Sequence, residues 1–328
     1  MKRFWALICV CALLMSACGT PQPAASTAPS AAPEPTPAET SAGSEGGIPG
    51  VTDENYPRID GSTSTLGIVR GIYAAAHPNH DYDDLPTEAS KTVPSYEKLI
   101  AGEVDLIIVP SASQDVLSMA EQAGVELEFT KIASEALIFI TAADNTAENI
   151  TEEQVREIYL HNGIANWTAL GGPDRRLVPI CRNANSGSQS QLDNLILHGE
   201  PMDPSIEANH VELTMEGMLY QVAYYHYGGL DAQPTTDSYA LGYTLYQYLM
   251  STDEITGIAS RLKILDFNGV AATPETIVSG EYPLADGYYA VTRAGLADDD
   301  PARCIVDWLT SEAGVARLER SGYITGAE

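Results

Sequence analysis

The sequence predicts an α/β protein whose hydrophobic core is divided between two lobes. The chain has 328 residues, of which 44% are hydrophobic and 19% charged, so it can bury a sizeable core, and a chain of this length tends to split that core. Short apolar, β-prone runs alternate with helical patterns along the sequence. Such alternation is typical of α/β lobes with mostly parallel sheets.

An export signal comes first. Two basic residues lead into the apolar run 4–14, which is too short to cross a bilayer but typical of a signal peptide. Residues 15–18 then resemble a bacterial lipobox, in which cleavage precedes lipidation of Cys18. We expect residues 1–17 to be a lipoprotein signal peptide and Cys18 to anchor the protein on the extracytoplasmic face of the cell membrane. The alternative is an ordinary cleavable signal with an incidental cysteine.

Residues 18–50 are predicted to be a disordered tether. Pro, Ala, Ser, Thr, Gly and Glu dominate this stretch, and large apolar side chains are almost absent from it. Such a segment cannot bury enough apolar surface to offset the entropy lost on ordering. We therefore expect the folded part to begin at about residue 51.

The folded part opens with a hydroxyl-rich loop at 60–65 that leads into a helix. The apolar stripe of this helix comprises Leu66, Ile68, Val69, Ile72 and Tyr73. A second helix is predicted over 95–101 and a buried parallel strand over 104–109. Farther along, we expect a strand over 136–140 and a helix over 151–160 with two acidic residues in its first turn.

The sequence of 177–197 predicts a strand, a loop and a helix, and the loop is suited to binding an oxyanion. Ser186 and Ser188 offer hydroxyl groups, and Gly187 lets the backbone approach a ligand closely. The first N–H groups of the following helix are unpaired and carry its positive dipole end. Arg182 adds a permanent charge with a fork-shaped donor set. The alternative is a plain helix N-cap.

Charge and cysteine content limit the partners. The formal net charge of −28 argues against nucleic acid and polybasic lipid contact, so an anionic ligand must be held by local donors. Cys181 and Cys304 are the two cysteines beyond the lipobox. A disulfide between them is allowed outside the cell, but we favour two buried free thiols.

Several segments, taken together and in order, resemble the phosphate-binding proteins of ABC importers. They are residues 151–159, 166–174, Arg182 with 186–188, 240–243, 268–277, 280–284 and 308–314. The resemblance covers nearly all of 55–325. It implies a two-lobed periplasmic-binding-protein type II fold with a central ligand cleft. Lobe 1 would comprise 51–140 plus 283–328, and lobe 2 would comprise 141–282.

The same resemblance implies which residues hold the ligand. Lobe 1 would supply Ser64, Thr65, the backbone of Leu66, and Thr92. Lobe 2 would supply Arg182, Ser186, Gly187 and Ser188, the last standing where the family usually has Thr.

One position departs from the family pattern. Phosphate binders of this family carry an Asp after the strand 104–109, which accepts the hydrogen of protonated phosphate and repels sulfate. Here Pro110 occupies that position, and we expect Ser111, the donor that follows it, to bind the ligand as well. We expect poor selectivity between phosphate and sulfate unless an acidic residue such as Asp115 folds back into the cleft.

Other candidate sites are weaker. The segment 77–84 contains metal-ligand types, but a solvated loop explains it better. The dense tyrosines between 220 and 248 suggest an aromatic cleft wall or, more simply, core packing. No His is placed to activate a serine, and no nucleophile elbow or Walker loop is present. We expect no catalysis, cofactor or metal.

The sequence therefore predicts a monomeric, non-enzymatic, lipid-anchored binding protein that captures an inorganic oxyanion, phosphate first, for an ABC permease. The alternatives are another ligand, such as sulfate, molybdate or a small phosphorylated solute, and a surface sensor or cell-envelope interaction module that kept the fold. An exported hydrolase is disfavoured because a general base is missing.

Overall fold

The computed structural model describes residues 47–227 and 237–326. All of them belong to one compact unit, Ser44–Glu328. The predicted signal peptide, Cys18 and nearly all of the predicted tether lie outside the described residues. No helix in the described ranges combines the length and the apolar character needed to cross a bilayer.

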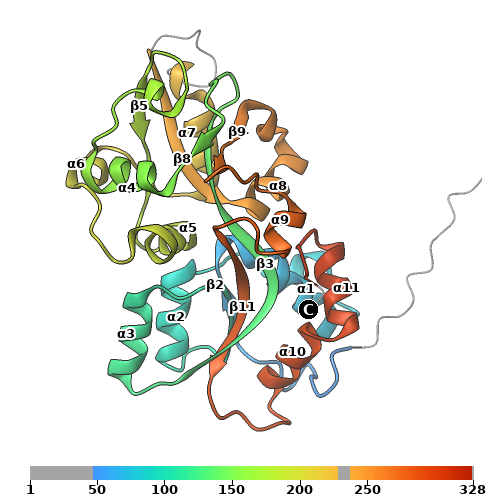
Figure 1. Ribbon diagram of the computed structural model, residues 1–328. Coiled ribbons are helices and arrows are strands. Elements are labelled where there is room, and N and C mark those ends of the chain that lie inside the picture. Colours follow the sequence, from blue (N-terminus) through green and yellow to red (C-terminus); the bar gives the residue numbers. More distant parts are fainter. Residues whose placement is uncertain (1–46, 228–236, 327–328) are drawn as a thin grey trace, which may run out of the picture. The chain divides into compact units, whose positions relative to one another are not determined.

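The main sheet has seven strands and runs through both lobes (Figure 1). Six of them lie in the order β1 (Ile59–Gly61), β2 (Leu106–Pro110), β11 (Ala285–Arg293), β3 (Leu127–Ala142), β8 (Ser238–Leu245) and β5 (Arg176–Pro179). The seventh, β9 (Leu262–Ile264), also pairs with β3. Two short parallel pairs complete the described strands, with β4 (Asn149–Ile150) beside β10 (Asp266–Phe267) and β6 (Cys181–Arg182) beside β7 (Val211–Glu212).

Strand β3 connects the two lobes. Its residues up to Ala136 pair with β11, and from Leu137 onward they pair with β8 and β9. The backbone N–H of Leu137 donates to the carbonyl of Leu284, just before β11 begins. The chain thus crosses between lobes at two adjacent points. The predicted α/β class with two lobes is confirmed.

The prediction of mostly parallel pairing was wrong. In the main sheet only β1 with β2 and β5 with β8 are parallel, whereas β11 and β3 pair antiparallel with each other and with their other neighbours. The reason is that two crossing strands pass between the lobes in opposite directions. Local sequence patterns do not reveal this because both kinds of pairing suit a buried apolar strand.

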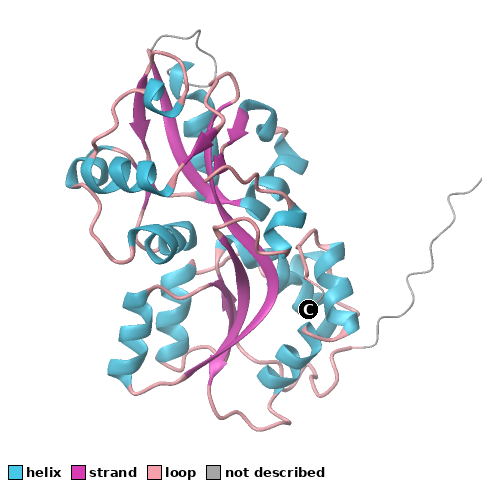
Figure 2. Ribbon diagram, in the orientation of Figure 1, coloured by secondary structure: helices cyan, strands magenta, loops and turns pink. Residues whose placement is uncertain are grey.

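Lobe 1 is a three-layer sandwich (Figure 2). Side chains on β2 alternate between its faces, as strand geometry requires: Leu106 and Ile108 pack in one core cluster, and Ile107 and Val109 in another. The first cluster lies under α1 (Leu66–Ala76), α10 (Pro301–Leu309) and α11 (Glu312–Arg320). The second lies under α2 (Thr92–Ile100) and α3 (Gln114–Ala123).

Helix α2 begins three residues earlier than predicted. Its start at Thr92 makes Pro94 the third residue of the helix. Proline is tolerated in the first turn because the N–H it lacks has no partner there. The sequence-based boundary at residue 95 was therefore too late, and Thr92 belongs to the helix and not to the preceding loop.

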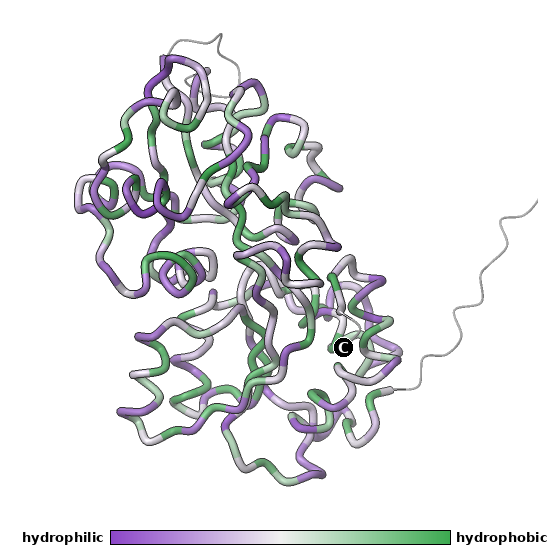
Figure 3. Tube along the Cα trace, in the orientation of Figure 1, coloured by the Kyte–Doolittle hydropathy of each residue, from purple (hydrophilic) through white to green (hydrophobic). Residues whose placement is uncertain are grey.

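Lobe 2 is built around the second half of β3 and around β8. Its helices are α4 (Glu152–His161), α5 (Gly187–Leu192), which continues as a π-turn over Asp193–Leu197, α6 (Pro204–Asn209), α7 (Met215–Tyr224), α8 (Tyr246–Thr256) and α9 (Pro274–Val278). Short 3-10 turns cover Thr63–Thr65, Tyr82–Asp84, Trp167–Leu170, Tyr225–Tyr227 and Ile258–Arg261. The lobe's core contains Phe139, Tyr159, Trp167 and Tyr243, all fully buried. Figure 3 shows apolar residues along these central strands.

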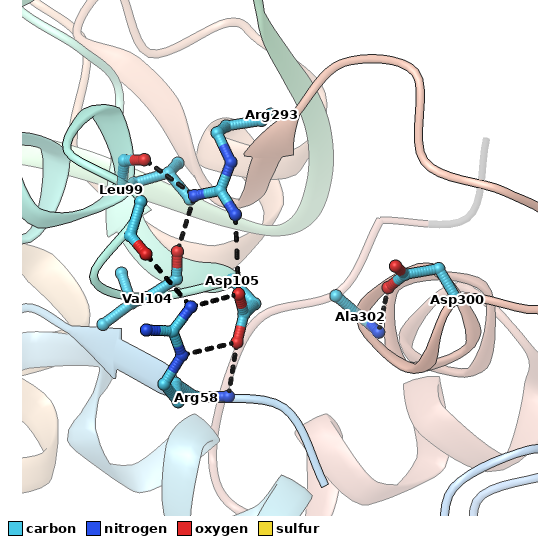
Figure 4. A network of polar contacts seen from close by, with 8 residues as sticks. Arg58, Leu99, Val104, Asp105, Arg293, Asp300 and Ala302 are labelled. Carbon is cyan, nitrogen blue, oxygen red and sulfur yellow. Dashed lines mark hydrogen bonds and ion pairs between the residues drawn. The ribbon is translucent and has the colours of Figure 1, made fainter. Parts of the chain in front are cut away.

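A charged network closes lobe 1 at the end of the sheet opposite Pro110 (Figure 4). The Asp105 carboxylate accepts from Nη2 of Arg58 at 2.7 Å and from its backbone N–H at 3.0 Å. Arg293 donates to the carbonyls of Leu99 and Val104 at 2.8 and 2.7 Å. The hydrogen bond from Arg58 lowers the pKa of Asp105. These bonds join β1, β2 and β11 at the amino end of β2.

Two further observations differ from the expectations. Ile48 and Val51 pack in the core of lobe 1, so ordered chain begins before residue 50, where the predicted tether ends. Cys181 and Cys304 are both free, but only Cys181 is buried, and Cys304 is half-exposed. Burial raises the pKa of the Cys181 thiol to about 11, so this thiol is protonated and unreactive at neutral pH.

Candidate functional site

A pocket of about 180 Å³ lies where the two lobes meet. Its lining from lobe 1 comprises Ser62, Thr63, Ser64, Lys91 and Thr92. Its lining from lobe 2 comprises Arg182, Ser186, Gly187, Leu213, Thr214, Met215, Glu216 and Tyr248. Seven of these thirteen residues carry a hydroxyl group, and Arg182 is a buried arginine among them.

The first loop of the site follows β1 and leads directly into α1. Thr65 Oγ1 accepts from the backbone N–H of Ser62 at 3.0 Å, and its hydroxyl donates to the carbonyl of Ile108 on the neighbouring strand. The Oγ atoms of Ser62 and Ser64 lie 3.0 Å apart. The loop is therefore held rigidly against the sheet, and it presents two serine hydroxyls to the pocket.

The second contribution of lobe 1 comes from the start of α2. Lys91 has φ 78° and ψ 173°, a conformation that costs of order 1–3 kcal/mol for a residue with a side chain. It is followed by Thr92, which is 1% exposed and whose Oγ1 has no hydrogen-bond partner. A buried hydroxyl without a partner is costly unless a ligand satisfies it.

Arg182 is the buried positive charge of the site. The side chain is held by lobe 2, since its Nε donates to the carbonyl of Glu212 at 3.0 Å, and its backbone N–H donates to the Tyr243 hydroxyl at 2.8 Å. Its Nη1 is buried and has no partner. Burial lowers the pKa of Arg182, as expected for a cation removed from water. An anion in the pocket would meet this free donor.

Gly187 brings the two lobes into direct contact. A Cβ atom added to it would lie 2.7 Å from Thr92 Oγ1 and 2.8 Å from Pro110 Cγ, both in lobe 1. Such distances leave no room for a side chain. The Nδ2 of Asn194 also donates to the carbonyl of Ala112 across the lobes at 2.8 Å. The described structure is therefore a closed arrangement in this region, with α5 facing α2 (Figure 1).

The structure brings together five of the nine ligand residues expected from the sequence. Ser64, Thr92, Arg182, Ser186 and Gly187 line the pocket. The other four do not line it: Thr65, Leu66, Ser111 and Ser188. Ser188 Oγ lies 3.0 Å from Ser186 Oγ, and the Ser111 hydroxyl donates to Asp286. The ligand role of each residue stays a prediction.

Sequence reasoning missed the wall formed by Leu213, Thr214, Met215, Glu216 and Tyr248. Thr214 is the N-cap of α7, and its hydroxyl accepts from the N–H of Gly217 at 2.9 Å. The sequence could have predicted this helix start, but not that the start of the helix lies beside the pocket. Tyr248 belongs to the tyrosine-rich segment. Most other tyrosines of that segment pack in or against the lobe 2 core, as predicted.

Among the described residues, the acidic residue that lines the pocket is Glu216, not Asp115, which the sequence suggested. Asp115 lines a neighbouring cavity of about 430 Å³, not the pocket. Pro110 is buried at the end of β2, beside Gly187.

The histidine-containing segment makes aromatic contacts. His77 stacks on Tyr73 with ring centroids 4.1 Å apart, and Tyr56 lies edge-on to it. Within residues 47–227 and 237–326, no group of three potential metal ligands is present.

Two α/β lobes joined by crossing strands, with a pocket between them that hydroxyl-bearing residues and Arg182 line, define a binding protein of the two-lobed periplasmic type. The chain belongs to the PBP superfamily, whose domain matches residues 31–313.

Its relatives include two proteins named phosphate-binding protein PstS. The chain is 29% identical over 197 residues to the protein of Borreliella burgdorferi, a match that spans 60% of this chain and 64% of the relative, less than two thirds of its length. It is 23% identical over 286 residues to the protein of Staphylococcus haemolyticus, covering 82% of this chain and 80% of the relative.

Solved structures show the same fold. A putative phosphate ABC transporter substrate-binding protein from Clostridium perfringens, with bound phosphate, has a TM-score of 0.61 at 20% identity, covering 82% of this chain and 98% of that one. An ABC-type phosphate transport receptor from Vibrio cholerae has a TM-score of 0.59 at 21% identity, covering 81% and 98%. At these identities the likeness concerns the fold alone.

Proposed function

We propose that this chain is a non-enzymatic, extracytoplasmic binding protein that captures an inorganic oxyanion, phosphate first, and delivers it to an ABC permease. One observation carries the proposal. Arg182 and Thr92 come from different lobes and line the same pocket, and each has a buried donor without a partner, Nη1 and Oγ1 respectively. The names of the relatives support phosphate as the first candidate.

The mechanism that fits this geometry is closure of the lobes around the anion. Ser64 and Thr92 come from lobe 1, and Arg182 and Ser186 come from lobe 2. An anion that hydrogen-bonds to both sets stabilises the closed state over the open one, and only this difference in affinity can shift the equilibrium. Closure also removes water, which strengthens charge-assisted hydrogen bonds. Because the net charge of the chain is −28, the protein as a whole repels an anion, and these local donors must supply the attraction.

The direct test is calorimetric titration of the full mature chain with phosphate, sulfate and molybdate. We expect phosphate to bind most tightly. If sulfate or molybdate binds more tightly, that anion and not phosphate is the ligand. If none of the three gives a heat of binding, the oxyanion proposal is wrong.

Pro110 is expected to limit the selectivity of this site. Its ring lies beside Gly187 and near Thr92, so a carboxylate at this position would reach the anion. Replacing Pro110 by Asp should raise the ratio of phosphate to sulfate affinity at least about tenfold, because a carboxylate accepts the phosphate hydrogen and repels sulfate. Pro110→Ala is the matched control, since it removes the ring without adding charge. An equal ratio in the two variants would place residue 110 outside the anion's reach.

Lipid anchoring at Cys18 forms part of the proposal and lies outside the described residues. Cys18→Ala should leave the protein unprocessed or released into the medium, because the lipid on Cys18 is the membrane anchor that we propose. Cell fractionation with labelled palmitate measures this. Normal processing and membrane retention of the variant would overturn the lipobox interpretation.

A further inference from the structure

A buried carboxyl group lies behind the pocket, close to where β3 passes from one lobe to the other. Glu135 is fully buried. Its Oε1 accepts from the backbone N–H of Ala136 at 2.8 Å and from that of Gln247, in the first turn of α8, at 3.0 Å. Its Oε2 is buried and has no hydrogen-bond partner of good geometry. A buried carboxyl oxygen in this state needs an explanation.

Tyr288 on β11 lies between this carboxyl and the pocket. Its buried hydroxyl interacts with the Glu135 carboxyl and with the Ser64 hydroxyl. Both contacts are looser than a well-formed hydrogen bond, since the Tyr288 hydroxyl has no partner of good geometry. The ring packs edge-on against Tyr323, with centroids 5.8 Å apart, and the Tyr323 hydroxyl donates to the Ser64 carbonyl at 3.0 Å. Ser64 therefore has Tyr288 behind it and the pocket in front.

The protonation of Glu135 decides what Ser64 can offer to a ligand. Each hydroxyl carries one hydrogen, and an ionised carboxylate only accepts. With Glu135 ionised, Tyr288 donates to it and accepts from Ser64, and Ser62, whose Oγ lies 3.0 Å from that of Ser64, donates to Ser64. Ser64 then presents its remaining lone pair to the pocket, which accepts the acidic hydrogen of a protonated phosphate and repels the oxygens of sulfate. With Glu135 protonated, all three donors reverse, and Ser64 donates to the anion.

We propose that Glu135 and Tyr288 are positioning residues that make Ser64 an acceptor for the acidic hydrogen of a bound oxyanion. This inference rests on the proposed function and supplies an acceptor in place of the family carboxylate that Pro110 replaces.

The Glu135 carboxyl changes its protonation near neutral pH, where binding can be measured on both sides of the change. Burial raises the pKa of its carboxyl to about 7, and the nearby Asp286 also raises it, whereas the contact with Tyr288 and the two backbone N–H groups lower it. The titratable groups that face it come from β11, α8 and the segment after α11: Asp286, Tyr288, Tyr246 and Tyr323. As the pH rises through about 7, Glu135 ionises, and Ser64 changes from donor to acceptor.

Glu216 is the rival acceptor. It lines the pocket itself, in the first turn of α7, and could take the hydrogen of the ligand without a relay. Its side chain is, however, exposed, so water competes for its carboxylate, whereas Glu135 is fully buried.

The test compares the unmutated protein with Tyr288→Phe, Glu135→Gln and Glu216→Gln by calorimetric titration with phosphate and with sulfate, at about pH 6 and about pH 8. At the higher pH we expect Tyr288→Phe to lower the phosphate-to-sulfate affinity ratio by about tenfold, as loss of one hydrogen bond to a charged group would. Glu135→Gln should change the ratio in the same direction. A purely structural role would weaken both anions equally and leave the ratio unchanged.

Sulfate gives an independent reading because it stays fully ionised over this pH range. Its affinity for the unmutated protein should fall as Glu135 ionises, and Tyr288→Phe should remove most of this dependence. Thermal melts establish whether each variant is folded. If Tyr288→Phe does not fold, Glu135→Gln provides the test in its place.

An unchanged ratio in both folded variants, within about a factor of two, would overturn the inference, as would a fall in the ratio confined to Glu216→Gln. These outcomes are distinct from failure of the proposed function. If the unmutated protein binds neither anion, that function is wrong and this inference goes with it, whereas binding with an unchanged ratio removes this inference alone.

Discussion

Replacing Arg182 by Ala should weaken oxyanion binding by at least about 2 kcal/mol, roughly thirtyfold in affinity. Arg182 is 5% exposed, and its Nη1 is a buried donor without a protein partner. Truncation would leave the anion without its full positive countercharge in a place where water cannot replace it. Calorimetric titration with phosphate measures the loss.

Two further variants make this result specific. Arg176 is an exposed arginine on β5, so Arg176→Ala removes the same charge from the protein without touching the pocket and should leave affinity unchanged. Arg182→Lys keeps the charge but loses the planar fork, and we expect an intermediate affinity. Wild-type affinity for Arg182→Ala would place this residue outside the binding site.

Replacing Gly187 by Ala should lower the affinity about ten- to a hundredfold by opposing closure of the lobes. The added methyl group would lie under 3.0 Å from Thr92 Oγ1 and Pro110 Cγ. Overpacking of this kind costs about 1–3 kcal/mol, and the cost arises only when the lobes are in contact. Titration gives the affinity, and small-angle X-ray scattering with and without phosphate shows whether the variant still closes.

A second substitution separates this clash from general damage. Adding Pro110→Ala to Gly187→Ala removes the contact with the proline ring and should restore part of the lost affinity, with Pro110→Ala alone as the control. The remaining contact with Thr92 Oγ1 limits the recovery. If the double variant binds no better than Gly187→Ala, the contact across the lobes does not control closure.

Local patterns sufficed for much of the fold. The alternation of apolar runs and helical stripes predicted the α/β class, and the helix predicted over 151–160 is α4, with Thr151 as its N-cap. The segment 177–197 forms strand, loop and helix as expected, with α5 beginning at Gly187. These features are readable because strand period, helix period and capping depend on residues only a few positions apart.

Relations between distant residues required the tertiary structure. The sequence alone proposed hydroxyl-rich loops and a buried arginine as anion donors, because their chemistry is visible in the chain. Only the structure decided that Gly187 packs against Thr92 and Pro110, that Asp115 lies outside the pocket, and that the Tyr288 hydroxyl lies near both Glu135 and Ser64. Strand order and lobe packing determine these contacts, and both depend on the crossing strands β3 and β11, whose antiparallel pairing joins segments about 150 residues apart and leaves no local periodicity to detect.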